Sequence, residues 1–282
     1  MTGSLKLYRT ARGPVLEVDD VVVRLSDEWD ALINHPSLAN YLRTAAARSP
    51  GGPRLEAPPL APAAGQEIWG AGVTYDRSRT ARIDESLAAG GGGGGGASFY
   101  DRVYTAERPE LFFKCAGWRA RGPEQPVRIR RDARWSVPEP ELAVVANGRG
   151  EIVGYTIGDD LSARDIEAEN PLYLPQAKIW DGACALGPGL LVREAPLPPE
   201  TTITLRIARG GATAFEGSTS LARMRRPFGE LVSYLFRETS FPTGCVLLTG
   251  TGIVPPDAFA LRAGDEIEIT VPEIGTLRNR VE

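Results

Sequence analysis

Two strand-like segments joined by an Asn-Gly dipeptide constrain the fold of this chain more than any other feature. The first is ELAVVA, residues 141–146, and the second is EIVGYTIGDD, residues 151–160; both are rich in residues that favour strands. Asn147-Gly148 follows the first segment, and this dipeptide is typical of the turn between two antiparallel strands. We therefore expect a β-hairpin that carries acidic residues at the open end of both strands.

Other strand patterns flank this hairpin, and helical patterns are interspersed without regular alternation. A second hairpin is predicted in LYRTARGPVLEVDDVVVRL, with Gly13-Pro14 near one turn, and a strand pair in the C-terminal GDEIEITVPEIGTLRNRV. Apolar spacing predicts helix within residues 26–47 and in RRPFGELVSYLFRE, and Ser162 followed by Asp165 indicates a helix start. This order favours an α+β fold built on twisted antiparallel sheet over a Rossmann fold or a TIM barrel.

The composition of two segments indicates how the chain is divided. Residues 49–65 are rich in proline and glycine, as linkers are, so we expect a small N-terminal α/β domain with its linker over residues 1–65 and a catalytic domain over 66–282. The run Gly90 to Gly96 has no side chains to bury and a large ordering entropy, which predicts a mobile loop. That loop is interpreted either as a surface insertion or as the hinge of a lid.

The scarcity of histidine limits the chemistry. His35 is the only histidine, and its place in an expected N-terminal helix or turn favours a surface role. Metal sites built from several histidines are therefore excluded, and acid–base chemistry must rely on Glu, Asp, Lys, Arg, Tyr or water.

Charge, hydropathy and cysteine content indicate the setting. The net charge of −4 gives no reason to expect a nucleic-acid partner, and no apolar run approaches the roughly 18 residues of a membrane span. Cys115, Cys184 and Cys245 show no metal-binding spacing and indicate reduced thiols. The N-terminus has no apolar segment typical of a signal peptide, so we expect a cytoplasmic protein.

Carboxylates lie at the start of the first strand of the central hairpin and at the end of the second strand. Glu139 and Glu141 flank Pro140, which suits a strand edge or a bulge, and residues i and i+2 of a strand face one side. Two such carboxylates either face water or, if buried, need protonation or a cation. Asp159 and Asp160 end the second strand and bring a third carboxylate close. An all-oxygen site suits Mg²⁺, with Mn²⁺ or Ca²⁺ as alternatives, although the pair of aspartates does not reveal which one would bind it.

Five segments carry a resemblance to a known family. They are EPELAVV, GYTIGDDLSARD, PQAKIWDGACALGP, LLTGTG and GDEIEITVPEIGTLRNRV, in that order. Over residues 66–282 the chain resembles the fumarylacetoacetate hydrolase family, and FYDRVYTAERPELFFK with RDIEAENPLYLPQAKIWDG resemble its 2-keto-3-deoxy-D-arabinonate dehydratase branch. The resemblance implies a mixed β-roll with a small N-terminal domain, usually in a homodimer.

The resemblance also implies roles for individual residues. Glu139, Glu141 and Asp160 match the family's metal ligands, which leaves Asp159 a supporting role. Lys178 matches the active-site lysine.

Further positions concern the substrate. Arg164 matches a substrate-contacting arginine, and Thr251 a threonine that holds a substrate oxygen. Glu167 stands where several relatives have glutamine. Lys114 is expected at a strand end near the site, without an assigned chemical role.

One departure from the family separates dehydration from hydrolysis. The C–C hydrolases of the family activate water with a histidine and a nearby glutamate on the lid. The corresponding residues 73–86, VTYDRSRTARIDES, contain no histidine and offer Arg82 and Glu85 instead. Because arginine cannot act as a base near neutral pH, hydrolysis is disfavoured.

The resemblance therefore implies a divalent-metal-dependent hydro-lyase that converts a 2-keto-3-deoxy sugar acid, such as 2-keto-3-deoxy-D-arabinonate, to 2,5-dioxopentanoate. Lys178 is the candidate base for the C3 proton, and a Schiff base on this lysine is less favoured because a metal already acts as the electron sink. Glu85 or Glu167 is expected to protonate the leaving C4 hydroxyl, and Arg82 and Arg164 to steer the anionic substrate or hold its hydroxyls. The alternatives are an acylpyruvate hydrolase, a 2-oxo acid decarboxylase, and an inactive binding protein.

Overall fold

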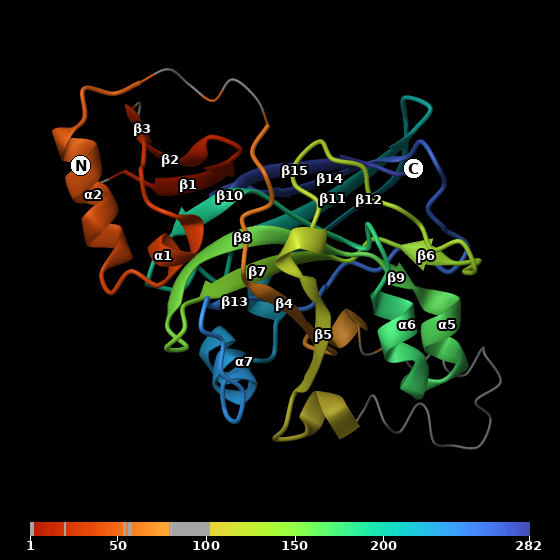
Figure 1. Ribbon diagram of the computed structural model, residues 1–282. Helices are drawn as coiled ribbons and strands as arrows, with labels where there is room; N and C mark the ends of the chain where they lie inside the picture. The colour runs from red at the N-terminus through yellow and green to blue at the C-terminus, as the bar shows by residue number, and fades with distance from the viewer. Residues whose placement is uncertain (1–2, 20, 53–54, 56–57, 79, 81–101) are drawn as a thin grey trace.

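A large mixed sheet forms the body of the chain (Figure 1). The computed structural model describes residues 3–19, 21–52, 55, 58–78, 80 and 102–282. Within them, nine strands pair in the order β3-β2-β1-β10-β8-β7-β13-β4-β5, and β13 with β4 is the parallel pair. In chain order these strands are β1 Leu5–Thr10, β2 Gly13–Val18, β3 Val21–Arg24, β4 Glu67–Gly72, β5 Glu110–Ala116, β7 Pro140–Ala146, β8 Ile152–Asp160, β10 Cys184–Val192 and β13 Cys245–Leu248.

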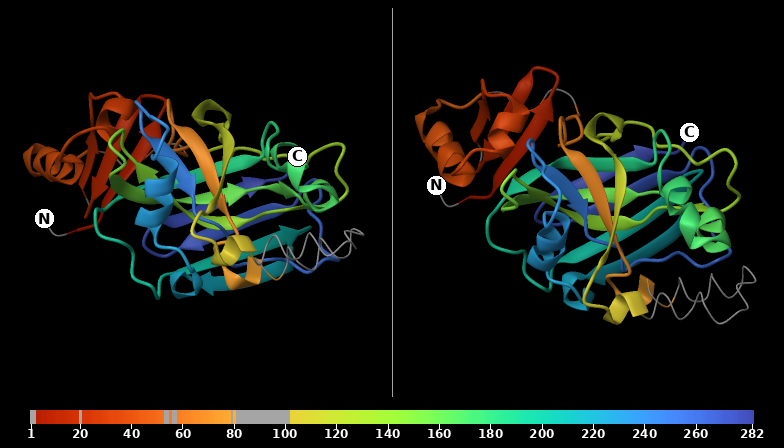
Figure 2. Two further views of the ribbon diagram at one scale, coloured as in Figure 1. Left: turned by 90° about the horizontal axis from the view of Figure 1, so that it is seen from below. Right: turned by 60° about the horizontal axis from the view of Figure 1, so that its bottom comes forward.

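A second, four-stranded sheet packs against the first and forms another layer (Figure 2). Its strands pair in the order β12-β11-β14-β15, and their bounds are β11 Thr202–Arg209, β12 Ala212–Ser220, β14 Glu266–Val271 and β15 Gly275–Arg280. The alternation of β7 explains the layering, because Leu142 and Val144 belong to the core shared with the second sheet, and Ala143 and Val145 to the core on the opposite face. Strand β7 is thus buried on both faces, as its continuous apolar run requires.

Short helices complete the described part of the chain. Helix α2 contacts β1, β2 and β3, whereas α5 and α6 lie side by side close to the end of β8 that carries the acidic residues (Figure 1). The helices described over their full length are α1 Trp29–Ile33, α2 Leu38–Arg48, α5 Arg164–Glu169, α6 Leu174–Lys178 and α7 Phe228–Leu235, with 3₁₀ turns η1 Gly117–Arg119, η2 Pro171–Tyr173 and η3 Leu221–Arg223. Two short strands, β6 Ser136–Val137 and β9 Ser162–Ala163, pair beside them. Among the described residues no helix is both long enough and apolar enough to span a membrane.

The structure confirms the predicted hairpins. Strands β7 and β8 pair antiparallel with Glu141 opposite Gly158, and the Asn147 side-chain oxygen accepts hydrogen bonds from the backbone of Arg149 and Glu151. The N-terminal pair β1–β2, the C-terminal pair β14–β15 and helix α7 are also present as predicted.

Two local predictions were wrong, and a third needs a refinement. Pro140 lies at the start of a central strand, not on an edge strand, because β7 pairs with both β8 and β13. Ser162 does not begin helix α5, because it lies in β9 and its hydroxyl donates to the Asp160 carbonyl at 2.9 Å. The helix predicted within residues 26–47 is present, but as two helices interrupted around Pro36.

The N-terminal strands are not separate from the main sheet. Strand β1 pairs antiparallel with β10, with Leu5 opposite Val192. The division at residue 65 stays a prediction. The run Gly90 to Gly96 lies outside the described residues, as do Arg82 and Glu85.

Candidate active site

Three buried carboxylates meet at the open end of the central hairpin. Glu139 directly precedes β7, Glu141 is the second residue of β7, and Asp160 is the last residue of β8. Antiparallel pairing brings these ends together, and the Asp160 backbone N–H donates to the Glu139 carbonyl at 3.0 Å. One oxygen from each side chain lies within 4.8 Å of the others, and all three residues are at most 3% exposed. The hairpin pattern thus correctly predicts that these side chains converge.

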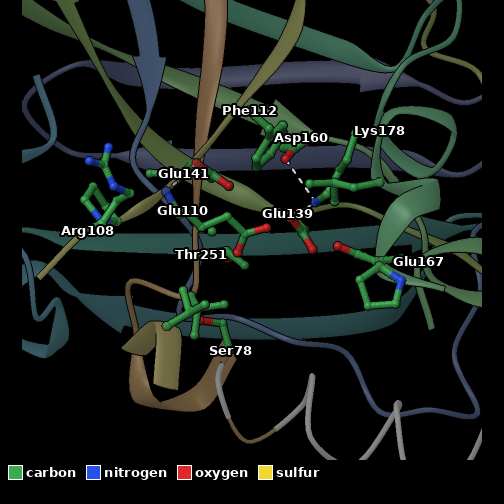
Figure 3. Close-up of a pocket in the computed structure, with 18 of the residues that line it drawn as sticks. Ser78, Arg108, Glu110, Phe112, Glu139, Glu141, Asp160, Glu167, Lys178 and Thr251 are labelled. Carbon is green, nitrogen blue, oxygen red and sulfur yellow. Dashed lines mark hydrogen bonds and ion pairs between the residues drawn. The ribbon is translucent and has the colours of Figure 1, made fainter. Parts of the chain in front are cut away.

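Buried cations surround the carboxylates, and Figure 3 shows one of them, Lys178. The Lys178 Nζ donates to Glu139 Oε2 at 2.7 Å and to Asp160 Oδ2 at 3.1 Å. Arg164 Nη2 lies 2.7 Å from Glu139 Oε1, and Lys114 Nζ forms an ion pair with Asp160 Oδ1. Isolated charges would be costly to bury, so this pairing makes the cluster tolerable in the fold.

A glycine turn holds the remaining carboxylate. The Gly250 backbone N–H donates to Glu141 Oε2 at 2.5 Å. Gly250 has a φ of +95°, and a Cβ there would overlap the Thr74 hydroxyl, so only glycine suits this close approach.

The surroundings of Glu141 disfavour the charged form of its carboxyl group. Burial raises the pKa of this carboxyl well above its ordinary value, and the negative charges of Asp160 and Glu139 raise it further. The Gly250 N–H and the charge of Lys178 oppose that rise in pKa. A hard divalent cation prefers oxygen donors and would relieve the repulsion, so Glu139, Glu141 and Asp160 fit Mg²⁺ in number and chemistry.

Asp159 contacts the backbone of the carboxylate cluster. It is fully buried, and its Oδ1 accepts the Glu139 backbone N–H at 3.1 Å. Burial raises the pKa of this carboxyl well above its ordinary value. The contact fixes the backbone that carries Glu139.

A cavity of about 670 Å³ opens over the carboxylates. Glu139, Glu141, Asp160, Lys178, Glu167 and Thr251, all singled out from the sequence, line it. Arg164 is not among the lining residues, and the contact that the structure shows for it is with Glu139, so its substrate contact stays a prediction.

Sequence reasoning missed several lining residues. Arg108, Glu110 and Phe112 line the cavity from β5 and the residue pair before it, and Ser78 lines it from another segment (Figure 3). Arg108, Glu110 and Phe112 alternate along ERPELFF, so a period-two pattern was the available signal. That signal did not reveal which face of the strand meets the site.

The fold and site define the class of protein. The chain belongs to the fumarylacetoacetate hydrolase family, because the family model described as fumarylacetoacetate (FAA) hydrolase C-terminal matches residues 101–282. The resemblance seen in the sequence is thereby confirmed.

Two relatives within the family are named as dehydratases. The chain is 46% identical over 212 residues to the 2-dehydro-3-deoxy-D-arabinonate dehydratase of Saccharolobus solfataricus, covering 75% of this chain and 70% of that protein. It is 45% identical over 221 residues to the probable 2-keto-3-deoxyxylonate dehydratase of Haloferax volcanii, covering 78% and 73%.

A solved structure extends the likeness to nearly the whole chain. It is a 2-keto-3-deoxy-D-arabinonate dehydratase complexed with magnesium and 2,5-dioxopentanoate. The TM-score is 0.82 at 34% sequence identity, over 99% of this chain and 98% of that chain. The predicted α+β architecture of this family is confirmed.

Proposed function

We propose that this chain is a divalent-metal-dependent dehydratase of a 2-keto-3-deoxy sugar acid. The preferred substrate is 2-keto-3-deoxy-D-arabinonate, and the product is 2,5-dioxopentanoate with one water. The observation that carries the proposal is the convergence of Glu139, Glu141, Asp160 and Lys178 beneath one cavity. The relatives named as dehydratases, and the neighbour complexed with magnesium and 2,5-dioxopentanoate, support the same chemistry.

The metal ion would have one role in the proposed reaction. Glu139, Glu141 and Asp160 would hold it, and Mg²⁺ is the preferred ion because the structural neighbour contains magnesium. A bound divalent cation polarises the 2-oxo group of a substrate and stabilises the negative charge that develops there, by several kcal/mol.

Lys178 is the proposed base. Its amine lies at the carboxylates that would hold the ion, and it also lines the cavity, so it can reach a substrate seated there. In the proposed reaction it accepts a proton from C3, and the C4 hydroxyl leaves with a second proton as water. The first product is a 2-oxo acid with a C3–C4 double bond and a C5 hydroxyl. Loss of a C5 proton and protonation at C3 move the double bond to C4–C5, and the enol formed there tautomerises to the aldehyde, so the atoms balance.

The leaving hydroxyl requires an acid, and two further carboxyl groups line the cavity and can take that role. Glu110 on β5 and Glu167 on α5 both line the cavity, and neither belongs to the three-carboxylate cluster. Thr251 is the proposed partner of a substrate oxygen, and Arg108 supplies positive charge for the substrate carboxylate. The proposed roles of Arg82 and Glu85 concern residues outside the described ranges.

Hydrolysis is the second candidate and has weaker support. His35 lines a different cavity, together with Leu38 and Arg149, so it cannot activate water at the carboxylates. Of the residues that line the active-site cavity in the described ranges, none is a histidine.

A cytoplasmic homo-oligomer, most simply a homodimer, is proposed for the whole protein. Trp118 is 74% exposed and Leu172 is 84% exposed, and large apolar side chains at the surface favour contact with a partner. The three cysteines are free thiols, which suits a reducing compartment.

The test is to analyse products from a panel of 2-keto-3-deoxy pentonates and hexonates incubated with Mg²⁺. We expect the D-arabinonate derivative to yield an aldehyde equimolar with substrate consumed, and no turnover after chelation of the metal. Release of CO₂, or cleavage to a shorter 2-oxo acid, would instead support the decarboxylase or the hydrolase. Absence of turnover across the panel would support a binding protein.

A further inference from the structure

A buried arginine outside the active-site cavity binds the backbone of a segment that borders the cavity. Arg226 lies between η3 and α7 and is 7% exposed. Its Nη2 donates to the Ala106 carbonyl at 2.5 Å and to the Val103 carbonyl at 3.2 Å. Its Nη1 donates to the Glu107 carbonyl at 3.2 Å and to Glu230 Oε1 on α7 at 2.5 Å. One guanidinium group thus holds three carbonyls of one short segment.

The segment bound by Arg226 forms part of the cavity wall. Val103 lines the cavity, and so does Arg108, which directly follows the last bound carbonyl. These residues, 103–108, form the wall segment. Glu110, which also lines the cavity, begins β5, where pairing with β4 starts. Arg108 thus lies between two anchors, the guanidinium group of Arg226 on one side and the main sheet on the other.

Helix α7 contacts the wall segment at a second point. The Tyr234 hydroxyl donates to Glu107 Oε1 at 3.3 Å, and the Arg108 guanidinium lies 5.7 Å from the centre of the Tyr234 ring. A cation over the face of a tyrosine ring is attracted to it. Glu230 and Tyr234 are four residues apart and share one face of α7. This face therefore holds the backbone of the wall segment through Arg226, and it also contacts the side chain of Arg108.

An arginine suits this task better than a lysine does. The guanidinium group carries its donors on a rigid plane, so Nη1 and Nη2 of Arg226 each reach two acceptors. A lysine ammonium presents all of its donors at one atom and could not replace every one of these contacts.

We propose that Arg226 is a positioning residue, which places Arg108 at the edge of the cavity for the carboxylate of the substrate. Arg226 is not among the described residues that line the cavity, so it acts through the wall segment. The inference rests on the proposed function, in which Arg108 supplies positive charge for the substrate carboxylate. Figure 3 shows Arg108 and Lys178 on opposite sides of the three carboxylates, so Arg108 would bind the substrate away from the base.

This role makes a specific kinetic prediction. An arginine that binds the substrate away from the reacting atoms stabilises the bound substrate and the transition state alike. Loss of such an interaction raises KM and leaves kcat nearly unchanged. If Arg226 only stabilised the fold, its loss would reduce the amount of active protein, so the apparent kcat would fall and KM would stay the same.

The first test removes the donors of Arg226. In Arg226→Met, with 2-keto-3-deoxy-D-arabinonate and Mg²⁺, we expect KM to rise about tenfold or more, the effect of losing one hydrogen bond to a charged group, and kcat to stay within about twofold. Arg223→Met, at an exposed arginine of η3, is the matched control and should leave both constants unchanged. An unchanged KM, or a fall in kcat alone, would overturn the proposal.

Two milder variants keep the proposal testable if Arg226→Met does not fold. Arg226→Lys retains the charge and part of the anchor, and Glu230→Gln removes only the ion pair that orients Arg226. Both should raise KM in the same direction as Arg226→Met, by a smaller factor. A normal KM in both folded variants would contradict the proposal.

Combination with Arg108→Met tests whether the two arginines act together. If Arg226 acts through Arg108, Arg226→Met should change KM by less than about twofold once residue 108 is already altered. The same rise in KM with and without the Arg108→Met change would contradict a role through Arg108.

The two proposals fail separately, because hydrogen exchange and ligand binding do not require turnover. In Arg226→Met we expect faster amide exchange in the wall segment and about tenfold weaker binding of pyruvate, measured by calorimetry with Mg²⁺ present. These changes in a protein that dehydrates no substrate of the panel would reject the function and leave the positioning role intact. Normal exchange and normal pyruvate affinity in an Arg226→Met protein that still dehydrates the substrate would reject the positioning role and leave the function intact.

Discussion

The ammonium group of Lys178 lies where a metal ion would also be drawn. Its Nζ contacts Glu139 Oε2, Asp160 Oδ2 and the Ser162 hydroxyl, at 2.7, 3.1 and 2.6 Å. The first two of these oxygens belong to proposed ligands of the ion, so the lysine and a cation favour the same negative charge. A divalent ion bound by these carboxylates would repel the ammonium group. The repulsion favours the neutral amine, which is the form that can accept a proton as the base.

Removal of the Lys178 amine should separate metal binding from turnover. In Lys178→Ala we expect the turnover number to fall by about 10²–10⁴, the range of a general base. Mg²⁺ affinity should be equal or higher, because a competing positive charge is removed. Steady-state kinetics and calorimetry check the two effects, with Lys6→Ala as the control. Turnover near that of the unaltered protein would reject Lys178 as the base.

The element that positions Glu141 is a turn after β13, not the hairpin alone. Thr249 anchors this turn, since its backbone N–H and its hydroxyl both donate to the Leu142 carbonyl. Gly250 then donates to Glu141, and Thr251 faces the cavity. One short segment therefore fixes both a proposed ligand and a proposed substrate contact.

Gly250→Ala should damage that turn. The added Cβ would overlap the Thr74 hydroxyl and lie 3.0 Å from the Ala71 carbonyl oxygen, at a φ of +95°. We expect a stability loss of about 1–3 kcal/mol together with weaker Mg²⁺ binding, because the N–H moves away from Glu141. Gly210→Ala is the matched control, since Gly210 has a φ of +58° and no atom near the added Cβ. If both variants lose the same stability and both still bind Mg²⁺ normally, the effect of Gly250→Ala is backbone strain alone, and the proposed role of the turn in holding Glu141 is contradicted.

For single strands and helices, the sequence predicted those features that depend on local patterns alone. The apolar alternation of β7 and β8 and the Asn147-Gly148 turn sufficed for the hairpin, and hence for the meeting of its acidic ends. The helix start at Ser162 failed because a tertiary contact prevailed over the local preference. The hydroxyl donates to the Asp160 carbonyl and accepts from Lys178, so it is not available to cap a helix.

At the scale of the whole molecule, curvature of the large sheet completes the site. Strands β8 and β5 are separated by β7, β13 and β4 in the sheet order, yet Lys114 of β5 contacts Asp160 of β8. The chain beyond β5 then forms a bridge between Arg121 and Ala185 of β10. This closure of the sheet, which brings β5 and the chain after it to β8 and β10, depends on the twist accumulated over several strands.

This closure explains what the sequence could not predict. Arg108, Glu110 and Phe112 reach the cavity only because β5 is brought across from the sheet edge. Neither spacing nor composition reports the curvature of a sheet, so these residues were missed. The family resemblance placed Lys178 in the site, but it gave no role to Lys114.

The central claim is that Glu139, Glu141 and Asp160 together hold one divalent ion, and calorimetric titration of Mg²⁺ into Glu141→Gln tests it most directly. Glutamine keeps the shape of the protonated acid, which burial already favours by raising the pKa of Glu141, so the variant should fold. The same raised pKa means that protons compete with the ion, so the affinity of the unaltered protein should fall as the pH is lowered.

We expect one Mg²⁺ per chain in the unaltered protein and about a hundredfold or greater loss of affinity in Glu141→Gln. Glu151→Gln, at a carboxylate on the same hairpin whose side chain is 60% exposed, should bind Mg²⁺ normally. Unchanged affinity in a folded Glu141→Gln protein would contradict the claim that these carboxylates form the metal centre.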